Sequence, residues 1–173
     1  ALCDFVFMVD GISKMHITGP NVIKAVTGEE ISAEDLGGAK VHSQESGVAH
    51  LVAKTEQESF EQVKKLLSFL PSNYLEVPPG GVDPDDPHSL TEEIEKIIPD
   101  SPSRAYDMKK IIRSIADHND FFEIQEDFAK NILIGFIRLN GKSVGVIANQ
   151  PMVSAGSLDI DASDKSARFI RFC

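Results

Sequence analysis

The chain has 173 residues, of which 42% are hydrophobic and 25% are charged, and this composition suits one globular domain or parts of two. Seventeen lysines and arginines stand against 27 aspartates and glutamates, which gives a formal net charge of -10. This balance excludes the basic surface that phosphate backbones select, so we expect no nucleic-acid partner.

Metal, disulfide and membrane signals are missing from the sequence. Cys3 and Cys173 stand at opposite ends of the chain, without the spacing of a disulfide framework or a zinc site. The five histidines have no i, i+4 pairing, so we predict no metal bound by this segment. Every apolar run is shorter than the ~20 residues that cross a bilayer, and we expect no membrane insertion.

The start of the chain predicts alternating strands and helices. The apolar run at 5–9 is typical of a strand buried on both faces, and Met15–Ile17 indicates a second short extended piece. Pro20 and Gly28 delimit a short helix, because proline suits a first helical turn and glycine ends a helix. The pair Gly37–Gly38 permits either a close backbone approach or a positive φ angle.

A strand at 48–53 and a long amphipathic helix follow. Two capping boxes are present, one at 32–35 and one formed by Thr55 with Glu58. The second box opens a helix that Pro71 ends, with these apolar residues at helical spacing: Phe60, Val63, Leu66, Leu67 and Leu70.

The stretch 78–102 has the composition of a linker, because it holds six of the nine prolines and an acidic cluster. Within it, apolar residues predict one or two amphipathic helical turns, at Leu90, Ile94, Ile97 and Ile98.

The last third of the chain predicts a helix, a strand, a hairpin and a helix. Asp107 is expected to cap a helix with Met108, Ile111, Ile112 and Ile115 on one face, and 121–124 indicates a strand. Asn140–Gly141 joins two apolar strands at 132–139 and 142–148, which predicts a two-residue β-hairpin. Ser163 or Asp161 is expected to cap the final helix, whose shared face comprises Ala162, Ser166, Phe169, Ile170 and Cys173.

Three short segments are candidates for chemistry, and each has a structural alternative. Gly19–Pro20 leads into a helix and can present backbone amides to an anion such as a CoA phosphate, or form an ordinary turn. Gly37–Gly38 can supply oxyanion donors, although a packing role is favoured. Asn149–Pro151 directly follows a buried strand, where open α/β sites gather ligand contacts; an asparagine-stabilised turn is the alternative. The sequence has no nucleophile elbow, Walker loop or dinucleotide fingerprint.

Motifs along nearly the whole chain carry a family resemblance, and they occupy Phe5–Val9, Ile17–Glu30, Asp35–Ala39, Ser46–His50, Leu66–Pro71, Ala105–Asp107, Phe121–Glu123, Ala129–Ile132, Asn140–Gly145, Ala148–Pro151, Gly156–Lys165 and Ala167–Cys173. In these motifs the chain resembles the carboxyltransferase (beta) subunits of biotin-dependent acyl-CoA carboxylases. Within that family it is most like the propionyl-CoA carboxylase and methylmalonyl-CoA carboxyltransferase group.

The resemblance implies an α/β, crotonase-like fold built as a ββα superhelix, with the end of one domain and the beginning of a second. Residues 1–72 would form the C-terminal part of the N-terminal carboxyltransferase domain, on the acyl-CoA side. Residues 73–104 would be the Pro-rich acidic linker, and residues 105–173 would begin the C-terminal domain, on the carboxybiotin side.

The activity that the resemblance implies is transfer of a carboxyl group from carboxybiotin to the α carbon of propionyl-CoA or a similar short acyl-CoA. In the family, backbone amides stabilise the thioester enolate and the biotin ureido oxygen, and the step needs no metal. Thr18, Gly19 and Pro20 are expected near the acyl-CoA, and Asn149, Gln150 and Pro151 near the carboxybiotin.

The ends of the chain look cut, and the sequence is interpreted as an internal fragment. The family's oxyanion loops would lie before Ala1 and after Cys173, so we expect no catalytic residue and no activity in this chain alone. The implied partners are a biotin carboxylase and biotin carboxyl carrier (alpha) subunit and further copies of the intact subunit, as dimers assembled into a hexamer. The expected compartment is a bacterial cytoplasm, or the mitochondrial matrix in a eukaryote.

Three other functions stay open. The first is the carboxyltransferase subunit of a biotin-dependent methylmalonyl-CoA decarboxylase or transcarboxylase, which shares the fold and the half-reaction. The second belongs to another class and is a noncatalytic crotonase-like scaffold; a CoA sensor is a third and weaker reading.

Overall fold

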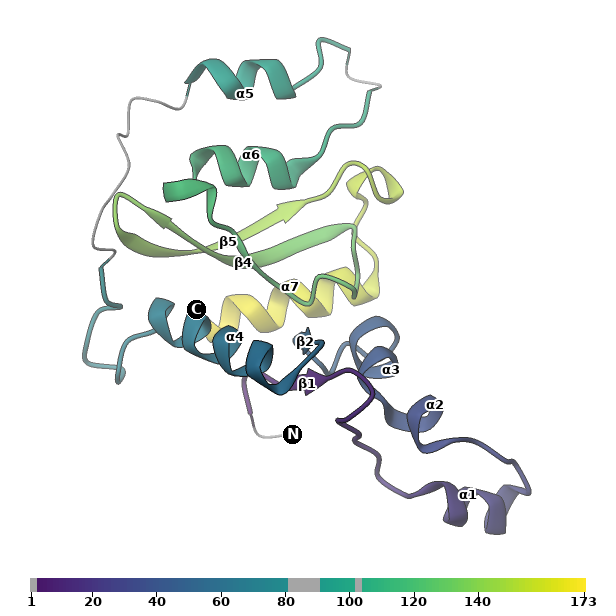
Figure 1. Ribbon diagram of the computed structural model, residues 1–173. Helices are drawn as coiled ribbons and strands as arrows, with labels where there is room; N and C mark the ends of the chain where they lie inside the picture. Colours follow the sequence, from purple (N-terminus) through teal and green to yellow (C-terminus); the bar gives the residue numbers. More distant parts are fainter. Residues whose placement is uncertain (1–2, 81–90, 102–103) are drawn as a thin grey trace. The chain divides into compact units, whose positions relative to one another are not determined.

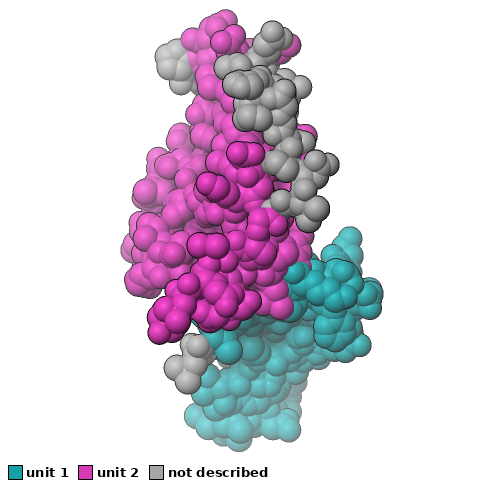
Figure 2. Space-filling view, turned by 90° about the vertical axis from the view of Figure 1, so that its left-hand side faces the viewer, with its two compact units in different colours: residues 1–64 teal, residues 65–173 magenta. Residues whose placement is uncertain are grey.

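The computed structural model describes residues 3–80, 91–101 and 104–173. The chain divides into two compact units, residues 1–64 and 65–173 (Figure 2). The division falls within helix α4, Glu56–Phe69. The domain bounds expected from the sequence, at residues 72 and 105, stay a prediction. Residues 81–90 of the expected linker, with Leu90 among them, lie outside the described residues.

The first unit is built on two short parallel strands. Strand β1, Phe7–Val9, pairs with strand β2, Leu51–Ala53, so both predicted strands are present but shorter than expected. Buried side chains between these strands and helix α3, Ala39–Gln44, form the core of the unit; they are Met8, Ala39 and Ala49, with Val6, Met15 and Val52 packed against them.

The predicted extended piece at Met15–Ile17 is wrong. This part of the chain forms no strand, and a single bridge joins Lys14 to Gly38. One backbone hydrogen bond follows, from the Met15 N–H to the Gly37 carbonyl at 2.8 Å. The apolar character of Met15 reflects its packing in the core and not a sheet position.

Helix α1, Pro20–Thr27, begins and ends as predicted. Proline occupies its first turn, and Gly28 closes it in the left-handed conformation with φ 78°. No residue of α1 is buried. The helix therefore depends on its own capping, because it packs no side chain into the core.

Gly37 and Gly38 are required for a close approach and not for a positive φ angle. Gly37 ends helix α2, Ala33–Gly37, whose cap Ser32 accepts a hydrogen bond from the Asp35 N–H as predicted. A Cβ atom at Gly37 would lie 2.0 Å from the Met15 carbonyl oxygen. Only glycine permits this contact.

Helix α4 starts at the predicted capping box, where the Thr55 hydroxyl accepts from the Glu58 N–H at 3.1 Å. Its apolar face is only partly buried. Leu66 and Phe69 are buried, whereas Phe60 and Leu67 are 62% and 60% exposed. Helical spacing predicted the element correctly but not how much of its face is covered.

The second unit contains a three-stranded antiparallel sheet. Strand β4, Ile132–Leu139, lies between β3, Phe122–Ile124, and β5, Lys142–Asn149. The Asn140–Gly141 turn has φ angles of 49° and 75°, which the predicted two-residue hairpin requires. Asp117, in the short 3-10 helix η1 at Asp117–Asn119, accepts hydrogen bonds from both turn amides, at 3.0 and 2.6 Å.

Helices cover both faces of the sheet (Figure 1). Helix α6, Met108–Ile115, lies on one face with Asp107 as its predicted cap, and helix α5, Thr91–Ile97, lies beside α6. The core under α6 contains Ile112, Ala116, Phe121, Leu133 and Ile137. Helix α7, Ile160–Phe172, lies on the other face, where the Phe136 ring centroid is 5.1 Å from that of Phe169 and 5.7 Å from that of Phe69.

The predicted cap of α7 is wrong. Asp159, and neither Asp161 nor Ser163, caps the helix, and its carboxylate accepts from the Ala162 N–H at 2.8 Å. All three residues are good caps, so the local sequence does not choose among them. Among the helices that the described residues form, none combines the length and the apolar character needed to cross a bilayer.

Candidate functional site

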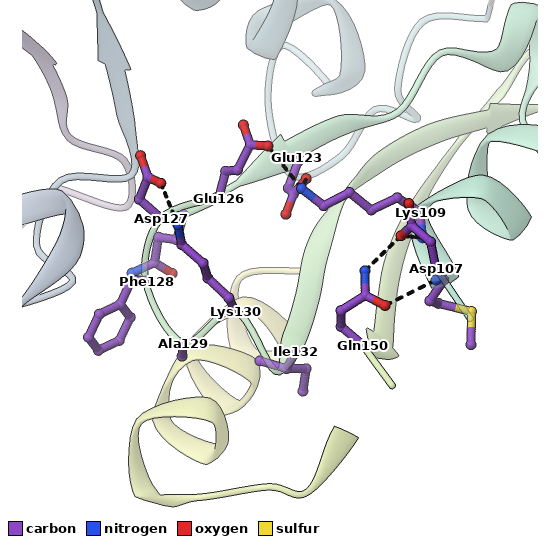
Figure 3. A network of polar contacts seen from close by, with 12 residues as sticks. Asp107, Lys109, Glu123, Glu126, Asp127, Phe128, Ala129, Lys130, Ile132 and Gln150 are labelled. Carbon is purple, nitrogen blue, oxygen red and sulfur yellow. Dashed lines mark hydrogen bonds and ion pairs between the residues drawn. The ribbon is translucent and has the colours of Figure 1, made fainter. Parts of the chain in front are cut away.

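The segment Asn149–Pro151 ends strand β5, and Gln150 ties it to the start of helix α6. The Gln150 side chain is 5% exposed. Its Oε1 accepts from the Met108 N–H at 3.1 Å, and its Nε2 donates to Asp107 Oδ1 at 2.8 Å (Figure 3). Gln150 therefore completes the cap of α6, and both of its polar side-chain atoms face the protein.

Asn149 holds the loop that follows. Its Nδ2 donates to the Gly156 carbonyl at 2.5 Å. The loop contains η2, Ser154–Gly156, in which all three residues have positive φ angles of 48°, 53° and 70°. Gly156 adopts this conformation without strain, whereas Ser154 and Ala155 carry side chains and adopt it at a cost in free energy.

Asn131, just before β4, is a third anchor that sequence reasoning missed. Its carbonyl accepts from the Gln150 N–H at 2.8 Å, and its Nδ2 donates to the Ser157 carbonyl at 2.7 Å. Asn131 is itself buried. One residue thus contacts both ends of the loop 150–157.

A charged cluster lies beside Gln150 (Figure 3). Lys109 Nζ is 2.6 Å from Glu123 Oε2 and 2.9 Å from Glu126 Oε1. The Glu123 side chain is only 8% exposed. Burial raises the pKa of the Glu123 carboxyl, although the bond to Lys109 opposes this shift. Glu123 faces α6 from β3, so the cluster joins this helix to the sheet.

Lys165 is the least expected side chain of the second unit. It lies on the buried face of α7 with 3% exposure, between the predicted apolar positions Ala162 and Phe169. Its ammonium group donates to four carbonyl oxygens, those of Gln125 at 2.9 Å, Phe128 at 2.6 Å, Ala129 at 3.3 Å and Ile132 at 3.0 Å. Burial lowers the pKa of Lys165 to about 8.

The buried position of Lys165 could have been recognised from helix periodicity, because residue 165 follows Ala162 by three and precedes Phe169 by four. What could not be recognised was the set of carbonyl partners, which are 33 to 40 residues away in sequence. The ammonium group fixes the loop between β3 and β4.

The other predicted site, Thr18–Pro20, belongs to the first unit. Gly19 is the N-cap of α1 in an extended conformation, with φ -77° and ψ 166°, and its carbonyl accepts from the Val22 N–H at 3.0 Å. A Cβ atom at Gly19 would meet nothing within 4 Å. No lysine or arginine occurs at 15–23. Any anion here would depend on backbone amides.

Two further features of the first unit concern chemistry. The Gly38 amide already donates to the Glu34 carbonyl at 2.7 Å, which supports the packing role of Gly37–Gly38 over an oxyanion site. His42 lies with Nδ1 2.9 Å from Ser46 Oγ and Nε2 2.6 Å from the Met15 carbonyl oxygen. The contact with Ser46 is local, at i, i+4, and the contact with the Met15 carbonyl links α3 to the segment around Met15.

No metal site is formed by the part of the chain that the structure describes, since no three or more histidine, cysteine, aspartate or glutamate side chains gather there to hold an ion. The predicted roles of Thr18–Pro20 near the acyl-CoA and of Asn149–Pro151 near the carboxybiotin stay predictions, because the geometry does not test them.

Comparison with known proteins extends over the whole chain. A propionyl-CoA carboxylase carboxyltransferase subunit of Haloferax mediterranei is 53% identical over 173 residues, and the alignment covers 100% of this chain and 34% of that protein. A methylmalonyl-CoA decarboxylase subunit alpha of Veillonella parvula is 52% identical with the same coverage. This chain therefore spans about a third of the length of these curated relatives.

Solved structures agree. The crystal structure of transcarboxylase 12S with methylmalonyl-coenzyme A and methylmalonic acid bound superposes with a TM-score of 0.94 at 44% identity. The match covers 98% of this chain and 33% of that one. The expected α/β, crotonase-like fold is confirmed by these neighbours. A family model described as "Carboxyl transferase domain" matches residues 1–173, and the chain belongs to this family.

Proposed function

We propose that the full-length protein is the carboxyltransferase component of a biotin-dependent acyl-CoA carboxylase. It would transfer a carboxyl group from carboxybiotin to the α carbon of propionyl-CoA or a similar short acyl-CoA. The observation that carries this proposal is the 53% identity, over all 173 residues, to a propionyl-CoA carboxylase carboxyltransferase subunit.

The carboxybiotin side is assigned to Asn149–Pro151 and the loop that follows. Ten consecutive residues, 149–158, carry no charge in a chain that is 25% charged. A neutral cyclic urea suits such a segment, because backbone amides and carbonyls can match its carbonyl and N–H groups without an unpaired charge. The types of residue at 149–158 are therefore compatible with a bound biotin ring.

The acyl-CoA side is assigned to Thr18–Pro20. Thr18 is exposed, and the segment leads directly into α1. The first backbone N–H groups of a helix have no acceptor within the helix and point out from its N-terminus. A CoA phosphate is one group that such amides accept. This role stays a proposal, and no lysine or arginine occurs at 15–23 to reinforce it.

The proposed carboxyl transfer requires no nucleophilic side chain from the protein. Carboxybiotin supplies an activated carboxyl group when it is bound. The residues described here would hold and orient the reactants, while backbone amides stabilise the charge that develops. We assign no catalytic residue to this chain.

The proposed partners follow from the same assignment. They are a biotin carboxylase and biotin carboxyl carrier subunit, and further copies of the full-length protein assembled as dimers into a hexamer. The proposed compartment is the bacterial cytoplasm, or the mitochondrial matrix in a eukaryote.

A second candidate function is supported by specific relatives. The methylmalonyl-CoA decarboxylase subunits alpha of Veillonella parvula and Propionigenium modestum are 52% and 50% identical to this chain. The transcarboxylase 12S structure supports a third member of the same class. All three share the half-reaction between carboxybiotin and an acyl-CoA.

The test is carboxyl transfer by the full-length protein with biocytin as acceptor and methylmalonyl-, malonyl- or glutaconyl-CoA as donor. Preference for methylmalonyl-CoA is the expected result. Adding a biotin carboxylase, its carrier, ATP and bicarbonate, which supplies the carboxyl group, then tests the alternatives, because a carboxylase component should form methylmalonyl-CoA from propionyl-CoA under these conditions. Absence of transfer from every donor would favour the noncatalytic scaffold.

A further inference from the structure

The segment Asn149–Gln150 combines a predicted ligand role with side chains that are already bonded to the protein. Gln150 uses Oε1 and Nε2 on the first residues of α6, at 3.1 and 2.8 Å. Asn149 uses its Nδ2 on the Gly156 carbonyl at 2.5 Å. Both polar side-chain atoms of the buried Gln150 and the Nδ2 of the exposed Asn149 are thus bonded to the chain itself, and a ligand contact by any of these three atoms would compete with the fold.

The loop from Pro151 to Ser157 is fastened at both ends. At its start, the Asn131 carbonyl accepts from the Gln150 N–H at 2.8 Å. At its end, the Asn131 Nδ2 donates to the Ser157 carbonyl at 2.7 Å, next to the carbonyl of Gly156 that Asn149 binds. Asn131 is buried, so its position is fixed by the core.

The loop conformation needs such fastening. Ser154 and Ala155 have φ angles of 48° and 53°, a region that residues with a Cβ atom adopt at a cost in free energy. Without external bonds the loop would relax toward conformations with negative φ. Each asparagine bond to the carbonyls of 156 and 157 offsets part of this cost.

The fastened loop presents an uncharged, partly apolar surface. Met152 is 62% exposed within it, and Leu158 directly after it is 56% exposed. Ser154 and Ala155 are also exposed, whereas Gly156 is buried. The exposed groups of residues 151–158 are thus available to a ligand, whereas the Gln150 and Asn131 amides are buried and the Nδ2 of the exposed Asn149 is bonded to the Gly156 carbonyl.

We propose that Asn149, Gln150 and Asn131 are positioning residues that hold the loop 151–157, with residues 154–156 in the left-handed region, in the conformation in which it contacts carboxybiotin. This inference rests on the proposed function, and it assigns the contact to the loop and an indirect role to the three amide side chains. Variants of the three amide side chains should therefore affect the reaction through the conformation of the loop, and not through a lost contact with the ligand.

The test compares kinetic constants for biocytin and for methylmalonyl-CoA in the full-length protein. Asn149→Ala removes the bond to Gly156. The double variant Asn149→Ala with Ala155→Gly also removes the conformational penalty at residue 155, because glycine adopts positive φ angles without strain. Asn73→Ala is the matched control, since it deletes an exposed asparagine whose Nδ2 also makes one hydrogen bond, to Glu76 Oε1 at 2.8 Å.

The expected result is that Asn149→Ala raises the KM for biocytin about fivefold, the ratio that corresponds to one ordinary hydrogen bond. The KM for methylmalonyl-CoA should stay unchanged, and Ala155→Gly should restore much of the loss. Asn73→Ala should match the wild type in both constants.

Amide hydrogen exchange supplies a readout that does not depend on activity. The Gly156 and Ser157 amides donate to the Val153 and Ser154 carbonyls at 2.8 and 3.0 Å, so they should exchange faster in Asn149→Ala and recover in the double variant. Unchanged exchange would show that Asn149 does not hold the loop and would overturn the inference.

Three kinetic outcomes also contradict it. Equal changes in both KM values, or no change in either, would show that the loop does not contact carboxybiotin specifically. A rise for biocytin that Ala155→Gly does not rescue would make Asn149 a direct contact. Absence of transfer by the wild type would overturn the proposed function, and the carboxybiotin role with it, whereas the exchange data would still decide whether the asparagine holds the loop.

Discussion

A methyl group at Gly135, in the middle strand of the second unit, would collide with the neighbouring strand. Gly135 on β4 lies opposite Glu123 on β3 and Val146 on β5. An added Cβ atom would be 2.3 Å from the Phe122 carbonyl oxygen, 2.7 Å from a ring carbon of Phe121 and 2.9 Å from the Glu123 Cα. Two of these three atoms belong to the backbone.

The size of the effect follows from what can move. Rotation of the Phe121 ring can relieve one contact, but relieving the other two requires β3 to move away from β4. Overpacking a core costs about 1–3 kcal/mol when side chains can adjust, and more when they cannot. We therefore expect Gly135→Ala to lower the free energy of unfolding by at least about 3 kcal/mol, at the upper end of that range.

The assay is urea unfolding of the full-length protein, followed by far-ultraviolet circular dichroism. Gly80→Ala is the control, because its nearest contact would be the Gly141 carbonyl oxygen at an ordinary 3.8 Å. It should change stability by less than about 0.5 kcal/mol. Equal unfolding midpoints for the two variants would refute the steric argument.

Two further predictions concern charged groups of the second unit. Because burial lowers the pKa of Lys165 from 10.5 to about 8, the unfolded chain holds the extra proton between these values, and native stability should rise with pH across that window, by about 3 kcal/mol. Urea unfolding at pH 7.5 to 10.5 should show this rise for the wild type relative to Lys165→Met, and a constant difference would contradict it. Asp117→Ala should lower the free energy of unfolding by about 3 kcal/mol, because the turn amides of Asn140 and Gly141 lose their charge-assisted bonds to the carboxylate, at 3.0 and 2.6 Å. Thermal unfolding beside the exposed-carboxylate control Asp164→Ala measures it, and equal melting temperatures would contradict it.

Elements that depend on neighbouring residues were predictable from the sequence. The Asn140–Gly141 turn fixed the hairpin, because only its φ angles suit a two-residue connection. The caps at Ser32, Thr55 and Asp107 were found for the same reason, since each side chain bonds an amide two or three residues away.

Features that depend on distant partners were not predictable. Met15 is apolar because it packs in the core, and its neighbours in sequence do not reveal this. Phe60 and Leu67 keep helical spacing, yet both are exposed. The buried Lys165 ammonium group is stabilised by carbonyls 33 to 40 residues earlier, which accept hydrogen bonds from it.

The candidate site shows the same limit. The sequence marked Asn149–Pro151 from its place after a strand, but the partners of Gln150 lie 42 and 43 residues earlier. Asn131 carried no local signal at all, since its role depends on contact with both residue 150 and residue 157. The location could be predicted, whereas the direction of the side chains could not.

The two strand arrangements imply different folding speeds. In the β4–β5 hairpin, all eight paired positions lie within 18 residues of one another, so pairing can begin at the turn and extend along the strands, on the scale of ~1–10 μs for hairpins. The parallel pair β1–β2 joins Phe7 to Leu51, and it forms only after the intervening chain has closed a long loop. During synthesis, the earlier part of the chain must therefore wait longer for its sheet than the later part does for its own.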